Sequence, residues 1–244
     1  MAFSHNPNIV TEGLVLSLDA ADKISFSSGS TTWTDLSRNS NNGTLSAGTM
    51  GTVSGSNTIA FNGSSDYISI ADADNLSFGD GSTDSAFTIS AWVKMDDATY
   101  FMIASKGKAF DGDAEYSFFV GGGDNLSLEI FDESVDAYEK AVCNSTLTAY
   151  EGQWVHLVVT YDGRGGSSAN AGITFYVNGS SQAVTLSDAN TYVAMENHGG
   201  DVRVGRWHTV YAEGSMANVG IWDRVLTAEE VSQNFNAQRS RFGI

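Results

Sequence analysis

The sequence has little cysteine, little proline and no long hydrophobic run. Cys143 is the single cysteine and Pro7 the single proline among 244 residues. One cysteine excludes a disulfide within the chain and a zinc site built from several thiolates. The apolar runs are far shorter than the roughly 18 residues of a membrane-spanning helix, so we expect no membrane insertion. The segment from Met1 to Pro7 lacks the pattern of a secretory signal peptide, so we expect no such signal.

Basic residues are also scarce. The chain carries 12 Lys and Arg against 29 Asp and Glu, which gives a formal net charge of −17. A surface of this charge repels phosphate backbones and anionic lipids, so we expect neither a nucleic-acid partner nor a membrane partner. Hydrophobic residues make up 41% of the chain and aromatic residues 11%, which excludes intrinsic disorder.

What the sequence has in abundance is short runs of Val, Ile, Phe, Tyr and Thr separated by Gly, Ser, Asn and Asp. Apolar and polar residues alternate within these runs, which predicts strands with one buried face. An Asn178-Gly179 pair after one run predicts a hairpin turn. The expected strands are 14–18, 58–61, 67–70, 87–94, 100–105, 115–120, 126–131, 154–161, 173–177, 182–186, 202–205 and 215–222.

One helix is predicted, over 228–238 near the C-terminus. Thr227 and Glu230 form a capping box, and Leu226 and Val231 occupy the positions of a hydrophobic staple. The chain contains no internal repeat and no linker-like segment. We therefore predict one all-β domain, a two-sheet antiparallel β-sandwich of the jelly-roll type with a short C-terminal helix.

Seven segments, in order, resemble the laminin-G-like branch of the concanavalin A-like lectin/glucanase superfamily. The resemblance implies a concanavalin A-like jelly roll over residues 13–244, with one concave sheet, preceded by an N-terminal arm over residues 1–12. The segments are WTDLSRNSNNGTL (33–45), AFNGSSDYI (60–68), FTISAWVK (87–94), GQWVHLVVTYDG (152–163), ITFYVNG (173–179), VRVG (202–205) and MANVGIWDRVLTAEEV (216–231).

The two ends of the chain resemble stand-alone proteins of this branch from marine tailed bacteriophages, on EGLVLSLDAAD (12–22) and NFNAQRSRFG (234–243). This resemblance implies a non-catalytic structural or interaction protein at the surface of a virion, as a head decoration or a fibre or tail-associated subunit. Its partners would be other virion proteins, a second copy of itself and cell-surface glycans. Two alternatives stay open, a carbohydrate-binding module unrelated to a virion and a glycoside hydrolase.

The glycoside hydrolases of this superfamily carry an E-x-D-x-E motif on one strand. The nearest segment here runs from Glu129 to Glu133, where Phe131 replaces the middle acid and Asp132 points to the opposite face. Hydrolysis with retention needs two carboxylates about 5 Å apart. Because the motif is broken, we predict no catalytic residues.

A Gly-bounded loop late in the chain is the candidate ligand site. It contains Arg206, Trp207, His208 and Tyr211, and sugars are bound by stacking on aromatic rings with polar groups beside them. A second possibility is that Trp92, His156 and Tyr176, which share the non-core face of three expected strands, line the concave sheet, unless a loop fills that face.

Calcium is the candidate cofactor, in a structural role. Asp111, Asp113 and Glu115 place three carboxylates in five residues on a Gly-containing loop. Carboxylate, amide and carbonyl oxygens are the ligands that calcium prefers. The resemblance adds turn residues at which relatives hold calcium, namely Asn62, Asp66 and Asp162. The alternative is that these acids only solvate their turns.

Overall fold

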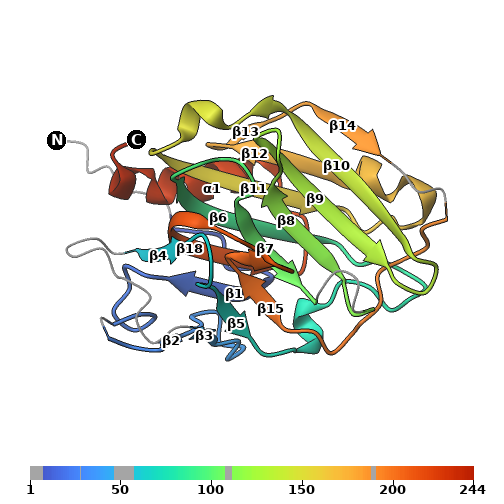
Figure 1. Cartoon of the computed structure of the whole chain (residues 1–244), viewed down its shortest axis with the longest axis horizontal. Coiled ribbons are helices and arrows are strands. Elements are labelled where there is room, and N and C mark those ends of the chain that lie inside the picture. Colours follow the sequence, from blue (N-terminus) through green and yellow to red (C-terminus); the bar gives the residue numbers. More distant parts are fainter. Residues whose placement is uncertain (1–7, 28, 47–57, 108–111, 188–190) are drawn as a thin grey trace.

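The computed structural model describes residues 8–27, 29–46, 58–107, 112–187 and 191–244. Within these ranges the chain forms a sandwich of two antiparallel sheets, with one short α-helix near the C-terminus (Figure 1). The predicted fold class is confirmed. No helix in the described part of the chain has the length and apolar character that crossing a membrane would require.

The smaller sheet has seven strands in the described residues, and its centre is the pair of long strands that carry the strongest sequence alternation. A short strand, β4 (Ile59–Asn62), pairs with β18 (Glu213–Trp222), which lies next to that pair. The main path runs β1 (Leu14–Asp19), β18 (Glu213–Trp222), β6 (Phe87–Met95), β11 (Trp154–Tyr161), β12 (Ile173–Val177) and β13 (Ser180–Ser181).

The larger sheet has nine strands in the described residues. It holds the longest meander of the chain, from β7 to β10, on one side of its centre. The order is β14 (Val184–Ser187), β10 (Ala137–Thr146), β9 (Asn125–Asp132), β8 (Tyr116–Val120), β7 (Met102–Lys106), β15 (Val202–Val204), β5 (Ile68–Ile70), β3 (Gly43–Leu45) and β2 (Thr32–Trp33).

The remaining elements lie outside the two sheets. A small hairpin follows β15, and the described residues also contain four short 3₁₀ turns, which connect strands or follow α1. The bounds are β16 (Arg206–Trp207), β17 (Val210–Tyr211), η1 (Asp74–Leu76), η2 (Thr148–Tyr150), η3 (Gly166–Gly172), α1 (Ala228–Gln238) and η4 (Arg239–Phe242).

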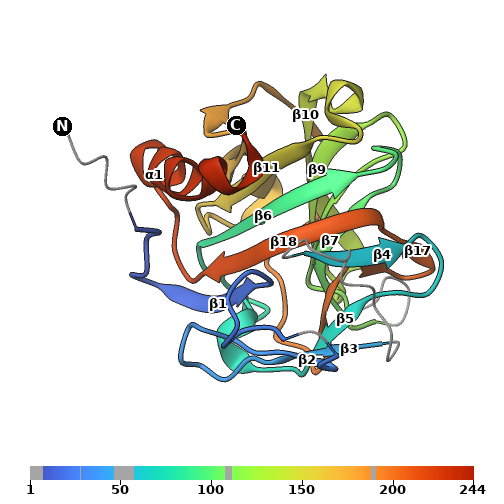
Figure 2. The ribbon, with the colours of Figure 1, turned by 90° about the vertical axis from the view of Figure 1, so that its left-hand side faces the viewer.

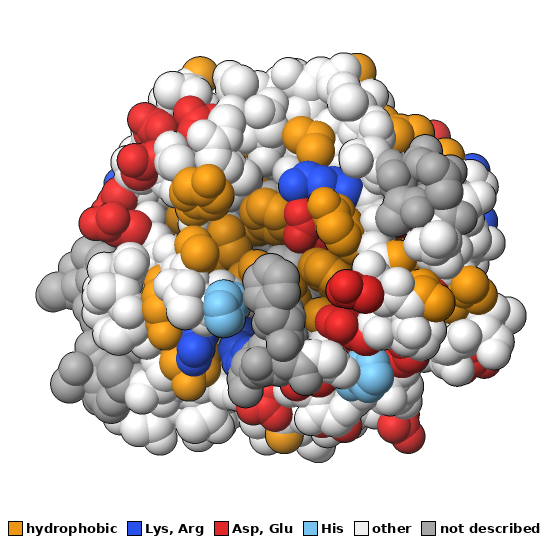
Figure 3. Space-filling view, turned by 45° about the vertical axis from the view of Figure 1, so that its right-hand side comes forward, with side chains coloured by type: hydrophobic (Ala, Val, Ile, Leu, Met, Phe, Trp, Pro, Cys, Tyr) orange, Lys and Arg blue, Asp and Glu red, His pale blue; other side chains and the backbone are white. Residues whose placement is uncertain are grey.

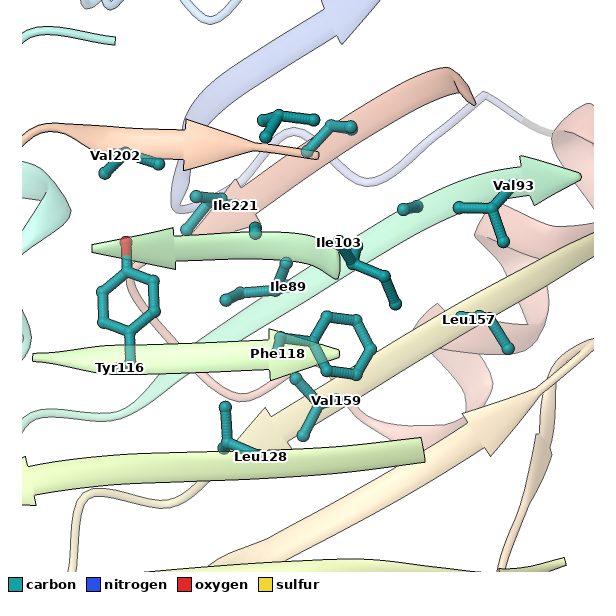
Figure 4. Packing of buried hydrophobic residues seen from close by; sticks show 14 of the residues in the cluster. Ile89, Val93, Ile103, Tyr116, Phe118, Leu128, Leu157, Val159, Val202 and Ile221 are labelled. Atoms are coloured by element: carbon teal, nitrogen blue, oxygen red, sulfur yellow. The ribbon is translucent and has the colours of Figure 1, made fainter. Parts of the chain in front are cut away.

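The core lies between the two sheets and is filled by alternate side chains of both. Ile89 and Val159 from the smaller sheet face Phe118 and Leu128 from the larger one, and all four are fully buried (Figure 4). Burying each such side chain stabilises the fold by about 2 kcal/mol relative to leaving it exposed. The strand alternation seen in the sequence therefore sets which face of each sheet turns inward.

The entry-loop motif at residues 33–45 has a structural role. The Asp35 carboxylate accepts hydrogen bonds from the backbone N–H groups of Ser17 (2.8 Å), Ser37 (2.8 Å) and Asn41 (3.0 Å). Each backbone donor satisfied in this way avoids the cost of an unpaired polar group. The loop is thereby held against β1.

A second polar cluster ties the segment 191–196 across the end of the sandwich. The Asp84 carboxylate accepts hydrogen bonds from the hydroxyls of Tyr161 (2.6 Å) and Tyr192 (2.8 Å) and from the backbone N–H of Met195 (2.8 Å). Burial raises the pKa of Asp84, against the hydrogen bonds that lower it. The cluster fixes the chain that leads into β15.

Most expected elements are confirmed, and the helix matches its predicted bounds. The hairpin at Asn178-Gly179 is confirmed too, since both residues have positive φ (49° and 79°) between β12 and β13. Strand β10 is not among the expected strands. The core-facing positions of β10 include Ala137, Glu139 and Ala141, which are small or charged and give no strand signal.

Candidate functional site

The outer face of the larger sheet carries the candidate site. In β9 and β10 the residues alternate, so Leu128 and Ala141 point into the core while Glu129, Phe131 and Tyr138 point outward. The register places Phe131 opposite Tyr138. Their rings lie 5.9 Å apart, which makes an aromatic pair on the outer face of the sheet, next to the turn between β9 and β10.

The hairpin of β16 and β17 brings a third ring to this pair. Trp207 lies with its ring 5.4 Å from that of Phe131. The hydroxyl of Ser105 on β7 donates to the carbonyl of Arg206 at 2.8 Å, which anchors the hairpin to the sheet. His208 adopts a positive φ of 51° at the turn, so the chain reverses immediately after Trp207.

These side chains line an open groove of about 480 Å³. We call it the aromatic groove, and its lining is Glu129, Phe131, Glu133, Asp136, Ala137, Tyr138 and Trp207. Figure 3 shows hydrophobic side chains gathered around a hollow, with acidic and basic side chains next to them. A concave site with aromatic walls and a few polar groups is typical of binding sites for small ligands.

Charged groups in the aromatic groove are partly neutralised. The Lys140 ammonium lies 2.8 Å from the Glu129 carboxylate and 5.3 Å from the centre of the Phe119 ring. Partial burial raises the pKa of Glu133, whose carboxylate also accepts the backbone N–H of Ala114 at 3.2 Å. Asp136 sits in the turn between β9 and β10 with a φ of 51°. The groove therefore has more acidic than basic groups.

The structure divides the four predicted ligand residues between two places. Trp207 lines the aromatic groove, whereas Tyr211 lines a neighbouring hollow of about 290 Å³ together with Tyr100. The Arg206 guanidinium lies over two rings, 4.7 Å from Tyr67 and 5.1 Å from Tyr211. Its Nε donates to the carbonyl of His208 at 2.8 Å. Arg206 and His208 thus shape the hairpin.

Two aromatic rings of the groove, those of Phe131 and Tyr138, were not among the predicted ligand residues. In the sequence, Phe131 is the residue that breaks an acidic motif. In the structure, Glu129, Phe131 and Glu133 of that motif all line the aromatic groove. Tyr138 lies on β10, which was not expected to be a strand. Tyr138, Lys140 and Val142 recur at every second position, and this spacing is the signal that would have placed Tyr138 on an outward face.

The calcium candidates do not converge within the described ranges. There, no group of three or more His, Cys, Asp or Glu side chains is arranged to hold a metal ion. Glu115 lies 3.2 Å from the Lys106 ammonium, and Asp162 pairs with Arg164 at 2.5 Å. Asp111 lies outside the described residues, so calcium binding by Asp111 together with Asp113 stays a prediction.

The turn candidates for calcium are already engaged within their own loop. The side-chain oxygen of Asn62 accepts the backbone N–H groups of Ser64, Ser65 and Asp66 at 2.9–3.1 Å. Asp66 itself is buried next to this turn. These contacts account for the polar residues after β4 as turn-forming groups.

The alternative in which Trp92, His156 and Tyr176 line an open sheet is wrong. All three are buried under the C-terminal segment, which covers the outer face of the smaller sheet (Figure 2). The Trp92 ring stacks on Phe235 (5.7 Å) and Phe242 (4.2 Å), and its Nε1–H donates to the Gln238 amide oxygen at 2.7 Å. The covering element is α1 with η4, where the sequence analysis offered a loop.

The fold is shared with other domains of known structure, two of which were solved with a bound sugar. The ligand-binding domain of botulinum neurotoxin serotype D, solved with N-acetylneuraminic acid, has a TM-score of 0.64 at 14% identity and covers 94% of this chain. Domain 4 of AbnA, an extracellular GH43 arabinanase from Geobacillus stearothermophilus solved with arabinotriose, has a TM-score of 0.58 at 17% identity and covers 91% of this chain. The binding domain of Paraclostridial Mosquitocidal Protein 1 has a TM-score of 0.55 at 18% identity and covers 93% of this chain.

The lengths of these structures differ. This chain spans about half of the two toxin domains, 52% in each case, and 97% of the arabinanase domain. At such low identities the likeness establishes the fold alone. No curated protein sequence matches this chain. A family model matches residues 62–232, from the end of β4 into α1, and by this match the chain belongs to the concanavalin A-like lectin/glucanases superfamily, in its laminin-G-like group.

Proposed function

We propose that this chain is a non-catalytic carbohydrate-binding module and that the aromatic groove holds the glycan. The observation that carries the proposal is the gathering of Trp207, Phe131 and Tyr138 around one open groove that also contains carboxylates. Aromatic rings offer flat apolar faces to the C–H faces of a sugar ring, and carboxylates accept hydrogen bonds from its hydroxyls.

A hydrolytic role is the weaker alternative. Glu129 and Glu133 do lie in the same groove, but Phe131 stands between them in the strand and Glu129 is paired with Lys140. A general acid must be free to reach the leaving group, whereas the Lys140 ammonium occupies the Glu129 carboxylate. Turnover of laminarin, agar or alginate that is lost in Glu129→Gln would overturn the non-catalytic proposal.

The experiment that tests the binding proposal is a glycan array followed by titration calorimetry. We expect Trp207→Ala and Tyr138→Ala each to weaken binding about tenfold or more, because each removes one stacking surface from the aromatic groove. Tyr211→Ala is the matched control, since it removes a ring of the same hairpin that lines the neighbouring hollow. Unchanged affinity in Trp207→Ala together with a loss in Tyr211→Ala would move the site to that hollow.

The same array, repeated with calcium and then with a chelator, tests the calcium prediction. Binding that disappears in chelator and returns with calcium would support a calcium-dependent module. In that case Asp113→Asn should reproduce the effect of the chelator.

We further propose that the module is displayed on the surface of a bacteriophage virion, as a head decoration or a fibre or tail-associated subunit, and reaches the outside by host lysis. This rests on the resemblance of residues 12–22 and 234–243 to virion proteins. In the fold these two segments are in contact, because Arg241 pairs with Asp19 at 2.8 Å. Mass spectrometry of purified virions is the test, and a virion proteome without this protein would overturn the proposal.

A further inference from the structure

The charges in and around the aromatic groove select among glycans. Resting on the proposed function, we propose that the groove takes uncharged oligosaccharides and excludes anionic ones, such as sialylated or uronate glycans. Three features support this selectivity: the acidic lining, the contacts of the nearby basic side chains and the occupied backbone donors.

The lining of the groove is acidic. Of its seven residues, Glu129, Glu133 and Asp136 carry carboxylates and none carries a positive charge. Lys140, beside the lining, lies 2.8 Å from Glu129 and offsets that one carboxylate. Glu133 and Asp136 remain unbalanced. A carboxylate on a bound sugar would therefore meet like charges in a partly desolvated site, which is unfavourable.

The nearby basic side chains already face protein groups. Besides Lys140, Arg206 is held over the rings of Tyr67 and Tyr211 and donates to the carbonyl of His208. The His198 ring faces Glu196, with Nε2 and Oε2 3.7 Å apart. Binding an anionic sugar would require breaking one of these contacts.

The backbone donors at the end of the groove are also occupied by an acid. The Glu196 carboxylate accepts the N–H groups of Glu133 (3.1 Å) and Ser134 (3.0 Å). Two adjacent N–H groups of this kind are a common way to bind a ligand carboxylate. Here a side chain of the protein fills that position, so an anionic ligand finds no free pair there.

An uncharged sugar suits the same surroundings. Its hydroxyls donate to Glu133 and Asp136, and its ring faces stack on Trp207 and Tyr138. The net charge of −17 adds a long-range repulsion that slows the approach of polyanionic glycans at low salt. The acidic lining, the occupied basic side chains and the negative net charge therefore all favour an uncharged sugar over an anionic one.

The test is calorimetry with four probes, namely laminarihexaose, N-acetylchitohexaose, 3′-sialyllactose and an alginate hexasaccharide, at low and high salt. We expect at least one uncharged probe to bind at least about tenfold more tightly than either anionic probe. The double variant Glu133→Gln/Asp136→Asn should reduce this preference about fivefold at low salt, and less at high salt because ions screen the charges. Asparagine tolerates the positive φ at position 136.

The matched control is Asp97→Asn/Glu213→Gln, which removes two charges from the neighbouring hollow. It should leave the preference unchanged. Tighter binding of sialyllactose or alginate, or an unaltered preference in the groove double variant, would overturn this inference and leave the carbohydrate-binding proposal standing. If the protein bound none of the four probes and no glycan on the array, both the inference and the carbohydrate-binding proposal would be overturned.

Discussion

At the scale of single residues, burial separates side chains of the same chemical type into different roles. Trp207 lies half-buried at an open groove, whereas Trp92 is fully buried under α1. His156, one position from a core-facing residue on β11, is fully buried as well. Its Nε2 pairs with the Ser90 hydroxyl at 2.8 Å, and its Nδ1 has no hydrogen-bond partner among the described residues. His156 is thus a structural residue.

The burial of His156 makes stability depend on pH. Burial lowers the pKa of the ring to about 3, from an ordinary value of 6.5. Between these values the unfolded chain binds a proton that the folded chain does not, so the free energy of unfolding falls as the pH falls below 6.5. Between pH 6 and pH 4, we expect His156 to lower the free energy of unfolding by about 1.4 kcal/mol for each pH unit of acidification.

The measurement is urea unfolding of the wild type and of His156→Gln at several pH values. Both chains carry the same carboxylates, so their common titration cancels in the difference. The wild type should lose stability more steeply than the variant as the pH falls. Parallel pH profiles would contradict a neutral, buried imidazole.

At the scale of elements, one buried ammonium joins strands to a loop. Lys106, at the end of β7, contacts the carboxylates of Asp72 after β5 and Glu115 before β8, and donates to the carbonyl of Gly200 at 2.8 Å. The side chains of Lys106 and Glu115 are both fully buried. Burial raises the pKa of Glu115 to about 7, and the Lys106 ammonium acts in the opposite direction.

Removing this ammonium should weaken the larger sheet. Lys106→Met leaves two carboxylates without their common partner, and breaking a buried ion pair costs about 3–5 kcal/mol. Chemical denaturation measures the loss. Lys23→Met, at an exposed position, is the control and should change the free energy of unfolding by less than about 0.5 kcal/mol. Equal effects would mean that the buried cluster adds nothing to stability.

The start of α1 is a second element-scale feature. The Thr227 hydroxyl accepts the backbone N–H of Glu230 at 3.3 Å, and the Glu230 carboxylate accepts that of Thr227 at 2.9 Å. Arg224 also holds this carboxylate through two hydrogen bonds of 2.7–2.8 Å. The capping box predicted from the sequence is confirmed.

We expect Thr227→Ala to lower the free energy of unfolding by about 1 kcal/mol, because it removes the side-chain acceptor at the helix start. Thr227→Ser keeps that acceptor and should stay close to the wild type. Thermal and urea unfolding distinguish the two variants. A serine variant as unstable as the alanine variant would point to the lost methyl group instead of the cap.

At the scale of the whole molecule, the segment around Val10 and the C-terminal segment 228–242 close the outer face of the smaller sheet together. The backbone of Val10 is held by two hydrogen bonds. Its N–H donates to the Asn234 amide oxygen (2.7 Å), and its carbonyl accepts from the Trp222 indole N–H (3.0 Å). The Phe242 ring then stacks on Trp92 and Trp154, at 4.2 and 4.9 Å. The sandwich thus has one face covered by these two segments and one face that carries the aromatic groove.

Deleting residues 239–244 should uncover part of the Trp92 face. We expect a loss of about 2 kcal/mol in the free energy of unfolding, from the half-buried Phe242 ring and its two stacking contacts. Tryptophan fluorescence of the folded protein should shift to longer wavelength as Trp92 gains solvent. Deleting Ile244 alone, which is exposed, is the control. Unchanged emission in the longer deletion would contradict the covering role of η4.

Local patterns in the sequence were enough for the fold class, the helix and most strands. Alternation over 87–94 and 154–161, the Asn178-Gly179 turn and the Thr227 capping box are each decided by residues close together in the chain, and all are present in the structure. Strand β10 was not predicted, because its inward residues are small or charged and do not form an apolar alternation. A strand of that kind is stabilised by its neighbours β9 and β14, which the sequence does not place beside it.

By itself, the sequence determined which side chains of each strand turn inward and where the main elements begin and end, because these depend on neighbours within a few residues. Only the tertiary structure decided that Phe131, Tyr138 and Trp207 share one groove, that Arg206 and Tyr211 lie outside its lining, and that α1 covers Trp92. Those outcomes depend on strand order and on contacts between residues far apart in the chain, which alternation and turn signals do not encode.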